Sequence, residues 1–277
     1  MSNSSKSAHV GTRHALIALL LAAAAACGSS TSTESDTRTV QGPSLALGAG
    51  TVHGYITLDA QSHPVSVGVA FSDSALINLP TDALPGLPPG RMLTLALPPE
   101  ANAAGYDHVM LNWNAAGHDP VQIYGAPHMD VHIYSIPLTQ QLAMTPADSL
   151  FDVKSAKKPA SSYVPGTYFP LGAGVPMMGA HWGDPSSPEL APAPNAKPFT
   201  RTFLYGSYDG HFIFFEPMVT TSTLLATRTL DTPDESLPIQ VPAQYEKAGD
   251  YPTRYVVRYD GVSHQYIIAL EGLVHHN

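Results

Sequence analysis

The chain is poor in cysteine and in charge, and both shortages exclude classes of protein. Cys27 is the only cysteine among 277 residues, so an intramolecular disulfide, a zinc ribbon and a papain-like nucleophile are excluded. Charged residues make up 13 %, with acidic side chains in excess, so we expect no nucleic acid partner. The chain has no G-x-S-x-G elbow, P-loop or dinucleotide fingerprint, which argues against an α/β-hydrolase and against these nucleotide-binding enzymes.

The N-terminus has the order of an export signal. Lys6 and Arg13 precede an apolar run over 15–26, and this run is too short to cross a bilayer as a stable helix, which needs about 20 residues. The run ends in AAAAAC, which resembles the bacterial lipoprotein signal, where the cysteine receives the lipid. We therefore predict a lipoprotein signal peptide over 1–26 and lipidation of Cys27, with a secreted protein as the alternative.

The segment after the signal predicts a tethered domain outside the cytoplasm. Removal of residues 1–26 leaves 11 Lys and Arg against 22 Asp and Glu, a formal charge of −11. Residues 27–48 are polar and lack apolar periodicity, which predicts a flexible tether to the lipid. We expect one β-rich domain over 49–277, held to a membrane of the bacterial cell envelope. Its further partner is an unknown small molecule or protein, and a homo-oligomer is compatible with the sequence.

Short apolar runs rich in Val, Ile, Tyr, Phe and Thr indicate strands rather than helices. We predict strands over 51–58, 64–71, 91–97, 107–113, 121–124, 128–135, 199–206, 210–216, 253–260 and 264–271. Asp-Gly within FLYGSYDGHFIFF and YVVRYDGVSHQYIIAL predicts two tight hairpins. The C-terminal hairpin is either one more strand pair of the same sheet, which we favour, or an edge for self-association.

Helices are expected to be few and short. Helical turns are predicted only within 136–151 and 216–230, and proline-rich stretches at 79–90 and 184–198 predict long surface loops. The fold class that follows is all-β and mostly antiparallel, built as a β-sandwich or as a cupin-like barrel.

The segment GAPHMDVHIYS places three potential metal ligands on one face of a predicted strand. Side chains alternate along a strand, so His128, Asp130 and His132 point one way while the intervening apolar residues face the core. Imidazole and carboxylate together suit zinc, iron, manganese or copper. Because residues i and i+4 of a strand stand about 13 Å apart, a pair of these residues completed from elsewhere is a better site than all three.

The missing ligands have three candidate sources. His118 lies in the loop sequence NWNAAGHDP, His181 and Asp184 lie in MMGAHWGD, and Glu216 ends the apolar run HFIFFE. Each also has a structural interpretation. His118 would stabilise a turn, and His181 would pack on Trp182 and bond to Asp184.

Four segments together resemble a family of exported bacterial proteins of unknown function. The segments are LNWNAAGHDP, VQIYGAPHMDVHIY, GVPMMGAHWGD and FLYGSYDGHFIFFEPM. They are similar to the family's motifs W-N-x-x-G-H-x-P, P-H-x-D-x-H-x-Y, M-G-x-H-W-x-D and Y-G-S-Y-D-G-x-x-x-F-x-E-P-M. The resemblance puts the seven candidate residues at motif positions, and it implies no reaction. Those residues are His118, His128, Asp130, His132, His181, Asp184 and Glu216.

Two functions of different classes follow. The first is a metal-dependent domain in which a divalent transition metal activates water for hydrolysis, or supports an oxidation, with Glu216 or Asp184 as general base. The second is a non-catalytic binding or assembly protein of the cell envelope, in which the same polar face forms a structural hydrogen-bond network. The sequence leaves open whether the protein is an enzyme.

Overall fold

Sixteen strands dominate the computed structural model, which describes residues 36–83, 89–229 and 234–277. The predicted signal and Cys27 lie outside the described residues. The first sheet has the order β1-β3-β4-β15-β14-β12, with β2 paired to β3. Its strands are β1 (Arg38–Gln41), β2 (Leu45–Leu47), β3 (Gly50–Leu58), β4 (Pro64–Ser72), β12 (Asp234–Pro238), β14 (Arg254–Asp260) and β15 (Gln265–Glu271).

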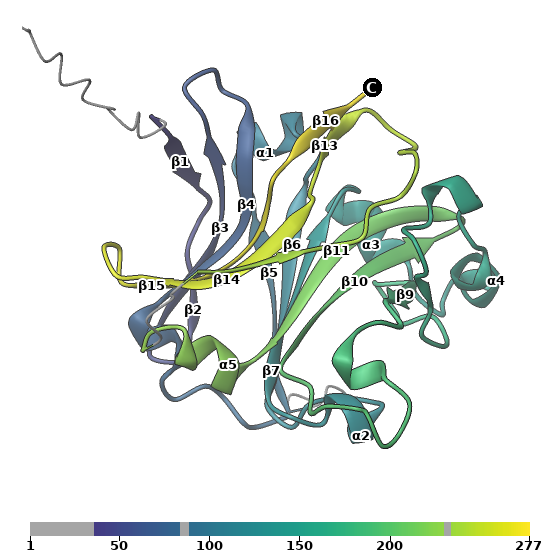
Figure 1. Ribbon diagram of the computed structural model, residues 1–277, viewed down its shortest axis with the longest axis horizontal. Helices are drawn as coiled ribbons and strands as arrows, with labels where there is room; N and C mark the ends of the chain where they lie inside the picture. The colour runs from purple at the N-terminus through teal and green to yellow at the C-terminus, as the bar shows by residue number, and fades with distance from the viewer. Residues whose placement is uncertain (1–35, 84–88, 230–233) are drawn as a thin grey trace, which may run out of the picture. The chain divides into compact units, whose positions relative to one another are not determined.

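The second sheet carries the histidine strand near its middle. Its order is β5-β6-β7-β11-β10-β9-β8, and Figure 1 shows it facing the first sheet. Its strands are β5 (Gly90–Ala96), β6 (His108–Asn114), β7 (His128–Tyr134), β8 (Phe169–Pro170), β9 (Ala180–Gly183), β10 (Arg201–Tyr208) and β11 (His211–Thr220). A separate pair joins β13 (Gly249–Tyr251) to β16 (Val274–His276).

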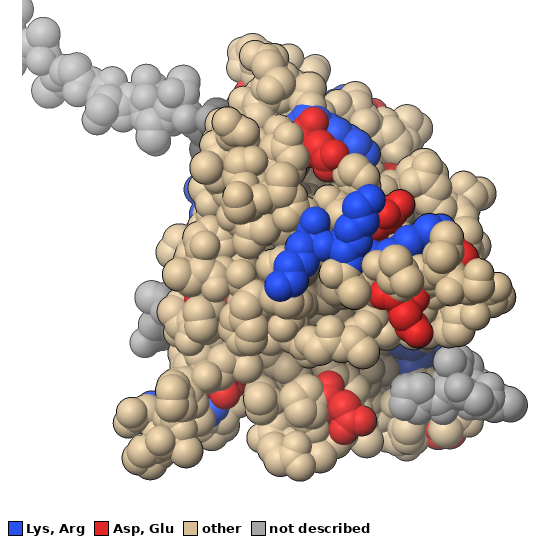
Figure 2. Space-filling view, turned by 90° about the vertical axis from the view of Figure 1, so that its right-hand side faces the viewer, with Lys and Arg blue, Asp and Glu red and all other residues tan. Residues whose placement is uncertain are grey.

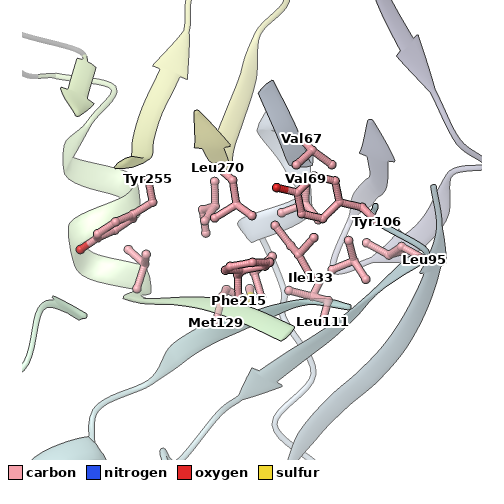
Figure 3. Close-up of a cluster of buried hydrophobic side chains, with 14 of the residues drawn as sticks. Val67, Val69, Leu95, Tyr106, Leu111, Met129, Ile133, Phe215, Tyr255 and Leu270 are labelled. Atoms are coloured by element: carbon pink, nitrogen blue, oxygen red, sulfur yellow. The ribbon is translucent and has the colours of Figure 1, made fainter. Parts of the chain in front are cut away.

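The two sheets bury one hydrophobic core between them. Val67, Val69 and Leu270 from the first sheet meet Leu111 and Ile133 from the second in one buried cluster, drawn in Figure 3. This packing confirms a mostly antiparallel β-sandwich with open sheets, in place of the cupin-like barrel. The arrangement also fixes the faces of β7, because residues on the side opposite Ile133 point away from this core.

Helices are short, as predicted, and most lie in the connections of the second sheet. The two helices between β7 and β8 lie on the side of that sheet away from the first, as Figure 1 shows. Among the described residues, no helix has the length and apolar character that crossing a membrane requires. The helices are α1 (Pro99–Ala103), α2 (Val121–Tyr124), α3 (Leu138–Ala143), α4 (Phe151–Ala156) and α5 (Thr221–Ala226), with 3-10 turns at Asp73–Leu76, Ser161–Tyr163 and Pro188–Leu190.

The structure corrects two local predictions and refines a third. Residues 121–124 form α2 rather than a strand, because the backbone N–H of Tyr124 bonds to Pro120 O within a turn bounded by Pro120 and Gly125. Residues 38–41 and 45–47, in the predicted tether, pair with β3 as strands. The second Asp-Gly hairpin forms, but its left-handed residue is His264 (φ 55°), four residues after Asp260.

Candidate metal centre

The polar residues of β7 are buried although they face away from the inter-sheet core. His128, Asp130 and His132 are 0 %, 3 % and 1 % exposed, while the alternating residues Met129 and Val131 belong to the core cluster. The connections on the outer side of the second sheet cover this face. Buried polar groups need partners, so the contacts of these three residues indicate what this face can bind.

The first group consists of His118, His128 and Asp130, whose potential ligand atoms lie within 4.8 Å of one another. His128 Nε2 is 3.0 Å from Asp130 Oδ1, and His118 Nε2 is 3.4 Å from Asp130 Oδ2. The loop after β6 brings His118 over the strand, and the Nδ2 of Asn114 donates to Asp130 Oδ2 at 2.6 Å. The carboxylate is therefore held in place by a neighbouring strand.

The second group consists of His132, His181 and Glu216, again with potential ligand atoms within 4.8 Å of one another. The register that pairs Phe215 with Ile133 puts Glu216 beside His132. His132 Nε2 is 3.1 Å from Glu216 Oε1, and His181 Nε2 is 3.4 Å from Glu216 Oε2. The two histidines of β7 thus belong to different groups, each with one carboxylate.

Three of the four histidines are oriented in the same way. The Nδ1 atoms of His118, His128 and His132 lie 2.8, 2.6 and 3.2 Å from backbone carbonyl oxygens, those of Asp119, Ala126 and Met110. An Nδ1–H that donates to a carbonyl leaves the Nε2 lone pair free. Metal-binding histidines commonly have this arrangement, because the second hydrogen bond fixes the ring orientation and the tautomer.

Within each group, potential ligand atoms face each other without forming hydrogen bonds. His128 Nε2, Asp130 Oδ1, His132 Nε2 and Glu216 Oε2 are buried side-chain atoms without a hydrogen-bond partner. In a neutral ring with its proton on Nδ1, the Nε2 lone pair would face carboxylate oxygens at 3.0 and 3.1 Å. Such contacts are repulsive unless a cation or a proton lies between the atoms. The geometry therefore suits a cation bound between these atoms or a second proton on the histidine ring.

The electrostatics of both groups also favour positive charge. Burial alone would lower the pKa of His118, but the Asp130 carboxylate raises it to about 9. Burial opposes protonation of His132 too, and Glu216 raises its pKa nonetheless. Burial lowers the pKa of His181. For Asp130, burial would raise the pKa, yet His118 and His128 hold it well below its usual range, so this carboxylate is ionised at neutral pH.

Both groups open onto one cavity of about 670 Å³. His118, Asp130, His132, His181 and Glu216 contribute to its wall. Figure 2 shows the outside of the segments that cover this sheet, where Lys and Arg lie beside Asp and Glu among mainly uncharged residues. A ligand pocket typically occupies 300–1,000 Å³, so the cavity has the size of a small-molecule site.

The sequence candidates divide into those that the structure brings together and one that it does not. Five of the predicted ligands, together with Glu216, fall into the two groups. Asp184 does not line this cavity: its Oδ1 accepts from the backbone N–H of Ser186, and its Oδ2 accepts from Gln240 Nε2 at 2.7 Å. Asn114 was not predicted from the sequence, although it lies in the same W-N-x-x-G-H motif as His118.

Comparison with known proteins gives one family similarity. A family model described as "TTHB210-like: Hypothetical protein TTHB210" matches residues 59–113, a segment from the β3–β4 turn to β6. The chain is similar there to an uncharacterised family, as expected, while the four sequence motifs and the export signal stay predictions. None of the six clustered residues falls within that segment. No curated protein and no solved structure matched the chain.

Proposed function

We propose that this protein is an exported, lipid-anchored metal-binding protein, and that its two groups of two histidines and one carboxylate each hold one divalent transition-metal ion. The first group supplies His118, His128 and Asp130, and the second supplies the remaining three residues. Two histidines and one carboxylate are a common ligand set for zinc and for non-haem iron. Manganese and copper also accept these donors, so zinc, iron, manganese and copper are the ions to test.

The observation that carries the proposal is the set of buried ligand atoms that make no hydrogen bond. A structural network, the alternative function, would pair a histidine N–H with each carboxylate oxygen. Here the Nδ1 of His128 and of His132 lie at hydrogen-bonding distance from backbone carbonyls, while Nε2 remains unpaired beside a carboxylate. A metal ion satisfies the nitrogen and the oxygen at once, at bond lengths of about 2.0–2.2 Å.

The proposal changes the roles expected of the carboxylates. Glu216 lies between two histidines and acts here as a ligand rather than as a general base. Asp184 has both oxygens hydrogen-bonded and is a poor candidate for the base. Three protein ligands leave coordination positions for water or substrate, so hydrolysis or oxidation stays a prediction that an activity screen on the metal-loaded protein tests.

The location rests on the sequence alone. The short apolar run ending at Cys27 supports export and lipid attachment. Metabolic labelling with a palmitate analogue tests it, since Cys27→Ser should abolish the label. Loss of the signal peptide without any label would support secretion instead.

The metal proposal is tested by elemental mass spectrometry on untagged protein that has been stripped with chelator, reloaded with one metal at a time and desalted. Wild-type protein should retain about two ions per chain. Asp130→Asn and Glu216→Gln, which preserve shape and remove charge, should each retain about one. Val262→Gln, at an exposed turn residue, is the control. Wild-type protein that retains no ion from any metal would overturn the proposal.

A further inference from the structure

The cavity next to the two groups has a wall that metal binding alone does not require. Beyond the metal groups, much of the lining is apolar, including Leu171, Val175 and Leu204. A site for an ion and its water ligands needs little of this surface. Apolar walls around a few polar groups are typical of sites for organic ligands.

The methionines are concentrated in the same wall. Met92, Met177, Met178 and Met218 line the cavity, and the whole chain has eight methionines. Methionine is unbranched and polarizable, and it adapts its shape to apolar ligands, which is why it is common on adaptable binding surfaces. Met92 is 37 % exposed on the edge strand β5, so inter-sheet packing does not account for its presence.

We propose that the cavity binds a small organic molecule with an apolar body and one anionic oxygen-donor head group, such as a carboxylate. The head occupies the open coordination positions of the ions, and the body lies against the methionine-rich wall. This inference rests on the proposed metal function, because the ions supply the contact for the head. It adds the class of ligand, which the two metal groups alone do not define.

The charges of the lining residues support placing the anionic head at the metal ions and the apolar body against the methionines. Among the lining residues, Asp119, Asp130 and Glu216 are acidic and Arg91 is basic, and Arg91 already pairs with Asp82 at 2.9 Å. An anionic head therefore finds its main attraction at the metal ions. The opposite arrangement would put a carboxylate against methionine and leucine without partners, which is unfavourable.

Octanoate and acetate are the probes, because they share one head and differ only in the apolar body. Isothermal titration compares both with the metal-loaded and the metal-free protein, and elemental mass spectrometry measures the metal in the same samples. Each buried methylene strengthens binding about fourfold. We expect octanoate to bind the loaded protein at least about 50-fold more tightly than acetate, and metal removal to weaken octanoate binding at least about tenfold.

Met92→Gln and Met92→Leu are the matched variants, because position 92 is partly exposed and tolerates both. Met92→Gln should weaken octanoate binding several-fold and leave acetate binding and metal content unchanged, whereas Met92→Leu should bind octanoate like the wild type. Equal affinities for octanoate and acetate in a fully metal-loaded protein would overturn this inference and leave the metal function standing. An octanoate affinity that does not change when the metal is removed would show that the carboxylate head does not bind the metal ions. Protein without retained metal would overturn the proposed function, and this inference with it.

Discussion

Substitutions at adjacent positions of β7 test separately the structural role of its core face and the metal-binding role of its outer face. Ile133 is 0 % exposed and lies in the core between the sheets. Ile133→Ala removes three carbon groups, worth about 2.4 kcal/mol at about 0.8 kcal/mol each. The cavity left behind brings the expected loss in the free energy of unfolding to about 3–4 kcal/mol. The metal content should stay at two ions per chain, because neither group contains this residue.

His132→Ala should have the opposite profile. The ring is 1 % exposed and lies 3.1 Å from Glu216, so its removal leaves a buried carboxylate with one histidine neighbour fewer. We expect the metal-free protein to lose about 1–3 kcal/mol of stability. One of the two ions should be lost, and with it the stabilisation from that ion, which is about 2.7 kcal/mol when the free metal is 100 times its Kd.

Urea unfolding with and without chelator, combined with elemental mass spectrometry, measures both variants. An Ile133→Ala protein that loses metal while its stability changes by less than about 1 kcal/mol would contradict the assignment of the two faces. So would a His132→Ala protein with two ions, because His132 would then not be a ligand.

Three further predictions concern residues around the groups and the metal itself. A Cβ at Gly206 would meet the Phe214 ring at 1.9 Å, and the centroid of this ring lies 5.0 Å from that of His132. Gly206→Ala should therefore lower the free energy of unfolding by about 1–3 kcal/mol. It should also weaken metal binding at the second group only, as measured by chelator competition. Asn114→Ala removes the hydrogen bond to Asp130 and should lower the metal affinity of the first group about 10–100-fold in the same assay. Chelator should lower the midpoint temperature of thermal unfolding. Readdition of metal should raise the midpoint again in proportion to the logarithm of the metal concentration. An unchanged midpoint would contradict metal binding at the two groups.

The alternation of β7 was predictable because it depends only on local geometry. Apolar residues at odd positions and ligands at even positions specify the two faces of any strand, and the structure has Ile133 in the core and His132 on the outer face. The hairpin at Asp209-Gly210 was predictable because Asp-Gly tolerates the positive φ angles of a tight turn, and both residues have positive φ in the structure. Residues 121–124 were misassigned because four apolar-rich residues are too few to distinguish a strand from a helical turn.

The division into two groups was not predictable from the sequence. It depends on which strands are neighbours: β7 pairs with β11 across a long connection, and this pairing places Glu216 beside His132. His181 reaches the same carboxylate only because β9 pairs with β10. Neither pairing has a local signal, and strands as short as β9, which has four residues, are too short to show alternation.

Anomalous X-ray diffraction from crystals of the metal-loaded protein, collected on both sides of the metal absorption edge, would locate the bound ions. We expect two difference peaks. One should lie about 2.0–2.2 Å from His118 Nε2, His128 Nε2 and an Asp130 oxygen, and the other should lie equally close to His132 Nε2, His181 Nε2 and a Glu216 oxygen. Peaks confined to the C-terminal His275 and His276, or no peak within the outer face of the second sheet, would contradict this assignment.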